Sequence, residues 1–189
     1  EKLGEYMAKK KKVTKTSYLI MALICLAISA VLPMLTDQVP RFGQGLRPMH
    51  IPVLIAGFAC GPVIGFVVGL AAPMLSLLLH GVPALIPAGF AMSFELATYG
   101  LISGLLYSQL PRKTGSIYVS LITAMIVGRI VWGASMIALS SQAGLHFTYQ
   151  MFMTYAFIDA MPGVLLHIVL IPAVVIALEK TNLAYRGRK

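Results

Sequence analysis

The sequence predicts an all-α integral membrane protein with six transmembrane helices and with both termini in the cytoplasm. Hydrophobic residues make up 58% of the 189 positions and charged residues only 11%, which leaves too little polar surface to cover a water-soluble globule of this size. The apolar residues are collected into segments of a length that suits a bilayer. Most of the basic residues gather near the two ends of the chain, where they face anionic lipid head groups.

The net charge of +9 does not indicate a nucleic-acid partner. Six of the 15 basic residues lie in the first 15 positions and four in the last 10, and basic stripes interleaved with stacking aromatics are absent. Cys25 and Cys60 each stand in an apolar run, with no second Cys or His at a ligand spacing. This pattern disfavours a disulfide framework and a zinc site, so we expect free cysteines and no metal.

Three parts are expected along the chain. They are a basic N-terminal tail (residues 1–16), a six-helix membrane domain (17–179) and a basic cytoplasmic tail (180–189). Met7 and Ala8, followed by four lysines, resemble a natural start, so residues 1–6 are interpreted as an added remnant. The apolar segment after the lysines is too long for a signal-peptide core and is expected to stay in the membrane.

The first helix is predicted at residues 17–35, which supplies roughly the 20 apolar residues needed to cross a hydrocarbon core of about 30 Å. Small residues follow one face of it, and such a strip lets another helix approach closely. The strip consists of Ala22, Cys25 and Ser29, with Ala30 nearby. Two interpretations remain open, docking of a partner protein and packing inside this chain.

A polar loop and a helical hairpin come next. The loop, residues 36–49, contains Asp37, Arg41 and Arg47 and is long enough to cover a binding site. The hairpin helices are predicted at 50–59, which is short for a full span, and at 63–79. Four glycines repeat every four residues across the turn and allow close helix contact, and packing of the hairpin itself is the favoured interpretation. They are Gly57, Gly61, Gly65 and Gly69.

Three further helices are predicted at residues 90–110, 117–139 and 158–178. Residues 140–155 are polar and aromatic, which suits the interface between lipid and water. If the N-terminal lysines are cytoplasmic, six crossings place 12 of the 15 basic residues on that side. Every loop then agrees with the positive-inside rule.

Arg129 is the most informative residue, because an arginine at the centre of a membrane helix costs about 2.5 to 3.5 kcal/mol. At 1.5 Å per residue, Glu95 lies about 9 Å and Arg129 about 15 Å from the outer helix ends. The two side chains are expected either to form a structural ion pair or to frame a polar pocket together. In the second case Arg129 anchors an anionic group of a small ligand.

Other side chains are candidates for contact with such a ligand. Tyr99 and Trp132 are large and flat and carry one donor each, as pocket-lining residues do, although packing in the core explains them nearly as well. His80, Arg47 and Asp159 stand near the outer helix ends, as rim contacts or as ordinary interfacial residues. His167, inside the sixth helix, has no assigned role.

An enzymatic alternative rests on Ser135 and His167, which resemble the nucleophile and base of rhomboid intramembrane proteases. The pattern departs from that family, because Met136 stands where a glycine is expected and Ile171 where a small residue is expected. The sequence has no His-Glu-x-x-His helix and no glycine-rich phosphate loop with a lysine. We therefore expect a chain that neither hydrolyses ATP nor carries a metal.

Two segments resemble the substrate-binding S components of energy-coupling factor (ECF) vitamin transporters. They are HIPVLIAGFACGPVIG at residues 50–65 and FELATYGLISGLLY at 94–107, together with the basic N-terminus, the six helices and the long first loop. The resemblance implies a non-catalytic subunit that binds a vitamin near the extracellular face and no cofactor. It also implies docking on a transmembrane T component that is driven by two cytoplasmic ATPases using ATP and Mg.

In that family the first helix presents an Ala-x-x-x-Ala strip to the T component. The strip of this chain departs from the pattern, and Ala22, Cys25, Ser29 and Ala30 are the docking residues that the resemblance implies. The sequence is most similar to the pantothenate-type S components, and Arg129 suits the carboxylate of pantothenate. Pyridoxine, riboflavin and folate remain alternative ligands.

Overall fold

The structure, a computed structural model, describes residues 15–36, 47–181 and 183–185. Within these ranges every regular element is helical, and the six predicted helices are confirmed to within a few residues at most of their ends. The elements are α2 (Lys15–Thr36), α4 (His50–Cys60), α5 (Pro62–His80), η1 (Leu85–Gly89), α6 (Phe90–Gln109), α7 (Thr114–Gln142), α8 (Tyr149–Met153), η2 (Thr154–Ile158) and α9 (Met161–Lys180).

Five of the helical segments are long and apolar enough to cross a membrane, and α4 is a shorter apolar helix. With 11 residues, α4 is only about 16 Å long. Large apolar side chains on the outer faces of the long helices are exposed, such as Ile130 at 62% and Val169 at 72%. In a bilayer these side chains face acyl chains, and the protein is a multi-pass membrane protein.

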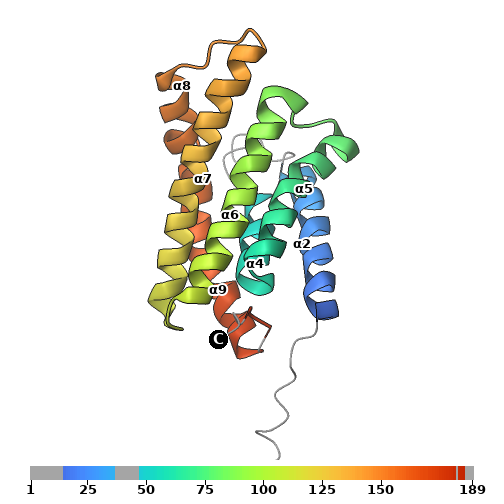
Figure 1. Ribbon diagram of the computed structural model, residues 1–189, viewed down its shortest axis with the longest axis vertical. Coiled ribbons are helices and arrows are strands. Elements are labelled where there is room, and N and C mark those ends of the chain that lie inside the picture. Colours follow the sequence, from blue (N-terminus) through green and yellow to red (C-terminus); the bar gives the residue numbers. More distant parts are fainter. Residues whose placement is uncertain (1–14, 37–46, 182, 186–189) are drawn as a thin grey trace, which may run out of the picture.

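The helices alternate in direction, so that the connections collect at two ends of the bundle (Figure 1). We call one the turn end: it holds the turn at Cys60–Gly61, the loop 110–113, the start of α2 and the end of α9. The other, the rim end, holds the loops 81–84 and 143–148. The shared position of the two described chain ends agrees with an even number of crossings, and the cytoplasmic side of the turn end stays a prediction from charge.

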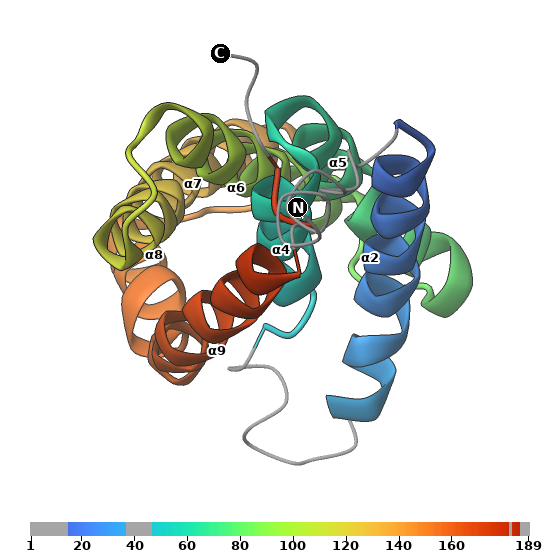
Figure 2. The same ribbon diagram turned by 90° about the horizontal axis from the view of Figure 1, so that it is seen from below.

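The short helix α4 lies in the middle of the bundle. It packs against α2, α5, α6 and α9, and the view along the bundle shows it among these longer helices (Figure 2). Nine of its eleven residues are buried, including Val53, Leu54 and Phe58. Because α4 is enclosed on several sides, its first residue, His50, is held inside the protein.

The repeated glycines let α6 approach the α4–α5 hairpin almost backbone to backbone. A Cβ atom added at Gly100 would lie 2.1 Å from the carbonyl oxygen of Gly65, and one added at Gly69 would lie 2.2 Å from that of Leu96. A Cβ atom at Gly65 would also lie 2.7 Å from the Cα atom of Gly57. The glycines therefore pack the hairpin, as predicted, and in addition position α6 against it.

The small-residue strip of α2 faces inward. Ala22 and Cys25 pack with Val53 and Val68 of the hairpin, and Ser29 and Ala30 are also buried. The outward face of α2 instead presents large apolar side chains such as Leu23, which is 58% exposed. In this conformation the strip packs inside this chain, and Ala22, Cys25, Ser29 and Ala30 are buried. Docking of a T component on these residues stays a prediction.

The last membrane segment begins earlier than predicted. The sequence assigns residues 140–155 to the interface and to no helix, but α7 continues to Gln142 and the chain is helical again from Tyr149 through α8 and η2. The reason is a tertiary contact: the Phe152 ring of α8 stacks on Trp132 of α7, with ring centroids 6.2 Å apart. This packing stabilises a helical turn that the polar sequence alone does not predict.

Candidate functional site

A group of polar side chains, which we call the polar cluster, is buried where α4, α6, α7 and α9 meet. Counted along the helices, Glu95, Arg129 and His167 each lie about 20 Å from the turn end, which explains why they meet. The cluster consists of His50, Glu95, Tyr99, Arg129 and His167, and each member is at most 7% exposed.

Glu95 Oε1 is the centre of the polar cluster. Arg129 Nη1 lies 2.7 Å from it, the Tyr99 hydroxyl donates a hydrogen bond to it at 2.9 Å, and His50 Nε2 lies 3.6 Å away. Two arrangements were expected for Arg129 and Glu95, and the structure shows the ion pair. It also places the Arg129 side chain inside the protein and away from the acyl chains.

Gly128 makes room for this arrangement. A Cβ atom at that position would lie 2.1 Å from the Tyr99 ring, so a larger residue would displace the ring that donates to Glu95. The glycine precedes Arg129 directly in α7. One turn of helix thus supplies both the space for the tyrosine and the guanidinium that pairs with the carboxylate.

Two histidines complete the polar cluster. The rings of His50 and His167 are stacked, with centroids 5.9 Å apart and planes 16° apart. Neither ring nitrogen of either histidine has a hydrogen-bond partner among the described residues, and Glu95 Oε2 has none either. Buried polar atoms are nearly always hydrogen-bonded, so these ring nitrogens and Glu95 Oε2 are free to bond to a small polar molecule.

Aromatic side chains cover the polar cluster on the side of the rim end. Trp132, one turn beyond Arg129 on α7, packs against the ring of Phe147 at 5.7 Å and stacks on that of Phe152 at 6.2 Å. We call Trp132, Phe147 and Phe152 the aromatic cover. Gly133 provides the space for it, because a Cβ atom there would lie 2.4 Å from the Phe152 ring.

Arg47 lies over the aromatic cover. Its guanidinium carbon is 5.9 Å from the centre of the Trp132 ring, and its Nη2 donates a hydrogen bond to the backbone oxygen of Tyr155 at 2.7 Å. Burial lowers the pKa of Arg47 from its usual value, repulsion from Arg129 lowers it further, and the charge of Glu95 acts in the opposite direction. Arg47 keeps its positive charge and is within electrostatic reach of the polar cluster.

The predicted site residues thus fall into three sets. Arg129, Glu95 and Tyr99 meet in the polar cluster, while Trp132 and Arg47 meet above it. Asp159 is exposed and acts on Arg47 through its charge alone.

His80 ends α5, and no described hydrogen bond, ion pair or ring contact joins it to the polar cluster. Sequence reasoning placed His50 near the mouth of the hairpin but included neither His50 nor His167 among the ligand contacts. Both histidines could have been found by the criterion that identified Arg129, because each is a polar side chain within an apolar helix.

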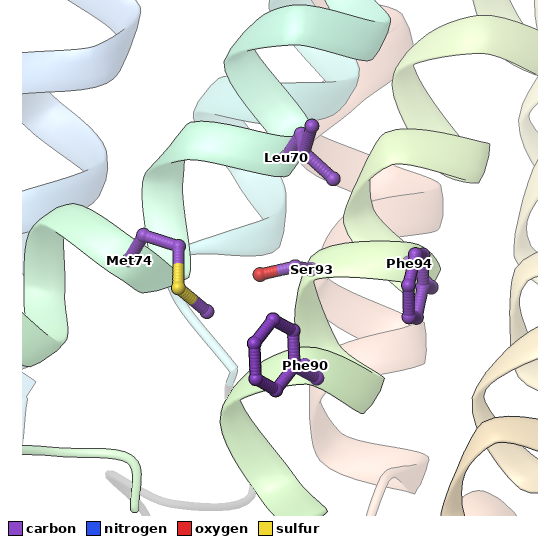
Figure 3. A pocket seen from close by; sticks show the side chains of 5 residues that line it. All are labelled: Leu70, Met74, Phe90, Ser93 and Phe94. Atoms are coloured by element: carbon purple, nitrogen blue, oxygen red, sulfur yellow. The ribbon is translucent and has the colours of Figure 1, made fainter. Parts of the chain in front are cut away.

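Two of the surface pockets lie away from the polar cluster, and no residue of the cluster lines either of them. One, of about 260 Å³, lies between α5 and α6 and is lined by apolar side chains and Ser93 (Figure 3). The other, of about 400 Å³, lies at the loop between α7 and α8, from Ile137 to Thr148. The polar cluster itself is closed off from solvent in this conformation, because its five residues are buried.

The protease arrangement is not formed. His167 stacks on His50, and neither of its ring nitrogens has a hydrogen-bond partner within the described part of the chain. Ser135 therefore does not donate to His167, as a nucleophile would to its base.

Comparison with known protein families agrees with the membrane fold. The family model described as ECF transporter, substrate-specific component, matches residues 17–180. No curated protein and no solved structure matches the chain. Since the match covers all six helices, the chain belongs to the family of substrate-specific components of ECF transporters.

Proposed function

We propose that this chain captures pantothenate near the extracellular side of the membrane. It then delivers the vitamin by associating with a transmembrane T component and two ATPases, which use ATP and Mg. Family membership supports a subunit that binds substrate and leaves ATP hydrolysis to its partners. The identity of the vitamin and its position rest on the charges and shape of the polar cluster.

The observation that supports pantothenate as the ligand is a surplus of positive charge in the candidate site. The positive charge of Arg129 repels that of Arg47, but Glu95 forms an ion pair with only one of the two guanidiniums, that of Arg129. Asp159 is exposed to solvent, where its charge is screened. A carboxylate on the ligand balances the surplus, and an arginine can hold it with two parallel hydrogen bonds.

The remaining parts of the site match the rest of pantothenate. Its branched apolar carbon centre suits the aromatic cover, since ligand sites combine apolar walls with a few placed polar groups. Pyridoxine and riboflavin lack a carboxylate, and folate carries two and is larger. The single surplus charge therefore favours a small monocarboxylate over these alternatives.

The route of entry follows from the order of the groups along α7. Trp132 lies between Arg129 and the rim end, and Arg47 lies over Trp132. A ligand that arrives from the rim end meets Arg47 first, and Arg129 afterwards. Because the positive-inside rule assigns the turn end to the cytoplasm, this route begins outside the cell.

Titration of the purified protein with pantothenate and with panthenol tests the proposal. Panthenol has an alcohol in place of the carboxylate, and Trp132, the only tryptophan of the chain, provides the fluorescence signal. We expect saturable binding of pantothenate and binding of panthenol weaker by about tenfold or more, because hydrogen bonds to charged groups contribute about 1.5–3 kcal/mol. Equal affinities, or no binding of pantothenate, would contradict it.

A pair of variants distinguishes the effect of a positive charge in the site from the effect of a positive charge elsewhere on the protein. Arg47→Ala should weaken pantothenate binding and leave panthenol binding nearly unchanged. Arg112→Ala is the matched control, because Arg112 is exposed at the turn end and donates to the backbone oxygen of Tyr185. If both variants bind pantothenate like the unaltered protein, Arg47 has no role in capture.

A further inference from the structure

We infer that His50 and His167 form a second recognition element, which holds hydroxyl groups of the bound ligand while the guanidiniums hold its carboxylate. The inference rests on the proposed function and names the ligand more closely. It makes the ligand class a small monocarboxylate that carries hydroxyl groups at the end of the molecule opposite the carboxylate.

The two histidines come from distant parts of the chain and meet inside the protein. His50 is the first residue of α4 and His167 lies in the middle of α9, and they are 1% and 2% exposed. Of the four nitrogen atoms in the stacked rings, only His50 Nε2 approaches a described polar group, Glu95 Oε1 at 3.6 Å, and the other three have no hydrogen-bond partner among the described residues. Two helices thus bring unpaired polar atoms to one buried place.

Such a pair is costly unless something binds it. A neutral imidazole has one donor and one acceptor, and each buried polar group left without a partner costs about 1–3 kcal/mol. Packing alone does not call for histidines here, because apolar residues of similar size fill a helix interface without that cost. A ligand that supplies hydroxyl groups provides a donor and an acceptor at each of them and removes the cost.

The position of the two histidines relative to Glu95 and Arg129 indicates which groups the ligand must carry. His50 Nε2 lies 3.6 Å from the same carboxylate oxygen that Arg129 Nη1 approaches to 2.7 Å. The guanidinium and the imidazole are therefore close enough for one small molecule to reach both. The edge of the Tyr99 ring packs against His50, at 5.3 Å between centroids, which holds the first imidazole in place.

Hydroxyl recognition by buried imidazoles predicts a strong selectivity. A site built to hydrogen-bond a substrate hydroxyl discriminates strongly against an analogue that lacks it, because the buried polar groups are then left unpaired. Water would satisfy the histidines equally well with either ligand and would give no selectivity. The difference between these two outcomes can be measured directly.

The test compares pantothenate with its dideoxy analogue, which keeps the carboxylate and the amide but lacks both hydroxyls. We expect the unaltered protein to bind pantothenate about tenfold or more tighter than the analogue. His167→Phe should weaken pantothenate by about that factor and leave the analogue within about twofold. His167→Gln, which restores a donor and an acceptor, should recover part of the selectivity.

Controls keep the two proposals distinguishable. His146→Phe changes an exposed histidine in the loop between α7 and α8 and should not alter the selectivity. His50→Phe repeats the test on the other ring should His167→Phe fail to fold. Unchanged selectivity in the variant that folds, or equal binding of both ligands to the unaltered protein, overturns the role of the histidines. Failure to bind either ligand overturns the proposed function itself.

Discussion

Arg129 of α7 and Glu95 of α6 meet as a buried ion pair, with Nη1 and Oε1 2.7 Å apart. The pair joins two helices at the same depth and is completed by the hydroxyl of Tyr99. It therefore contributes to the register of α6 against α7 as well as to the charge of the candidate site. A change at either residue affects stability and ligand binding together, so the two effects must be measured separately.

Glu95→Gln should destabilise the protein strongly. The substitution leaves the Arg129 guanidinium buried without its counter-charge, and breaking a buried pair on one side costs about 3–5 kcal/mol. Thermal unfolding in detergent should show a clearly lowered Tm. The double variant Glu95→Gln with Arg129→Met removes both charges and should recover much of the loss. A Tm equal to that of the unaltered protein in Glu95→Gln would show that the pair does not hold α6 and α7 together.

Gly100→Ala should disrupt the contact between α5 and α6. The added methyl group would lie 2.1 Å from the backbone oxygen of Gly65, and backbone cannot move aside as a flexible side chain can. Gly115→Ala is the matched control, since a Cβ atom there meets nothing within 4 Å. Alanine is also favoured over glycine in a helix by up to about 1 kcal/mol. We expect a lower Tm for the first variant and an unchanged or higher Tm for the second.

Thiol labelling of intact cells tests the orientation of the bundle. In a background with Cys25→Ala and Cys60→Ala, Lys113→Cys at the turn end should react with a membrane-impermeant reagent only after lysis. His146→Cys at the rim end should react in intact cells. Both positions are exposed. Reaction of Lys113→Cys in intact cells would place the basic loops outside and reverse the proposed route of entry.

Tyr107→Phe should weaken the turn end without changing ligand binding. Tyr107 is 3% exposed, and its hydroxyl donates a hydrogen bond to Glu179 Oε1 of α9. Loss of a hydrogen bond to a charged group costs about 1.5–3 kcal/mol, which should appear as a lower Tm. Tyr118→Phe, at an exposed tyrosine of α7, is the control. Reduced pantothenate affinity in folded Tyr107→Phe would show that the two ends of the bundle are coupled.

The sequence alone predicted the class of protein, the helices and Arg129 as a residue of the candidate site. These conclusions depend on properties that act locally along the chain. Apolar run length and loop charge decide which segments enter a bilayer, and the cost of a lone arginine in lipid singled out Arg129. The same reasoning brought Arg129 and Glu95 together, as an ion pair or as two sides of a polar pocket, because their depths can be counted along straight helices.

Only the tertiary structure decided which faces of these helices meet. The strip at Ala22 and Cys25 proved to face the α4–α5 hairpin, Phe152 ordered a helical turn on Trp132, and His50 and His167 joined the polar cluster. Each of these contacts depends on the rotation of a helix about its own axis and on partners far away in the chain. Helices that are apolar all round do not encode that rotation in their periodicity, so packing against neighbours sets it.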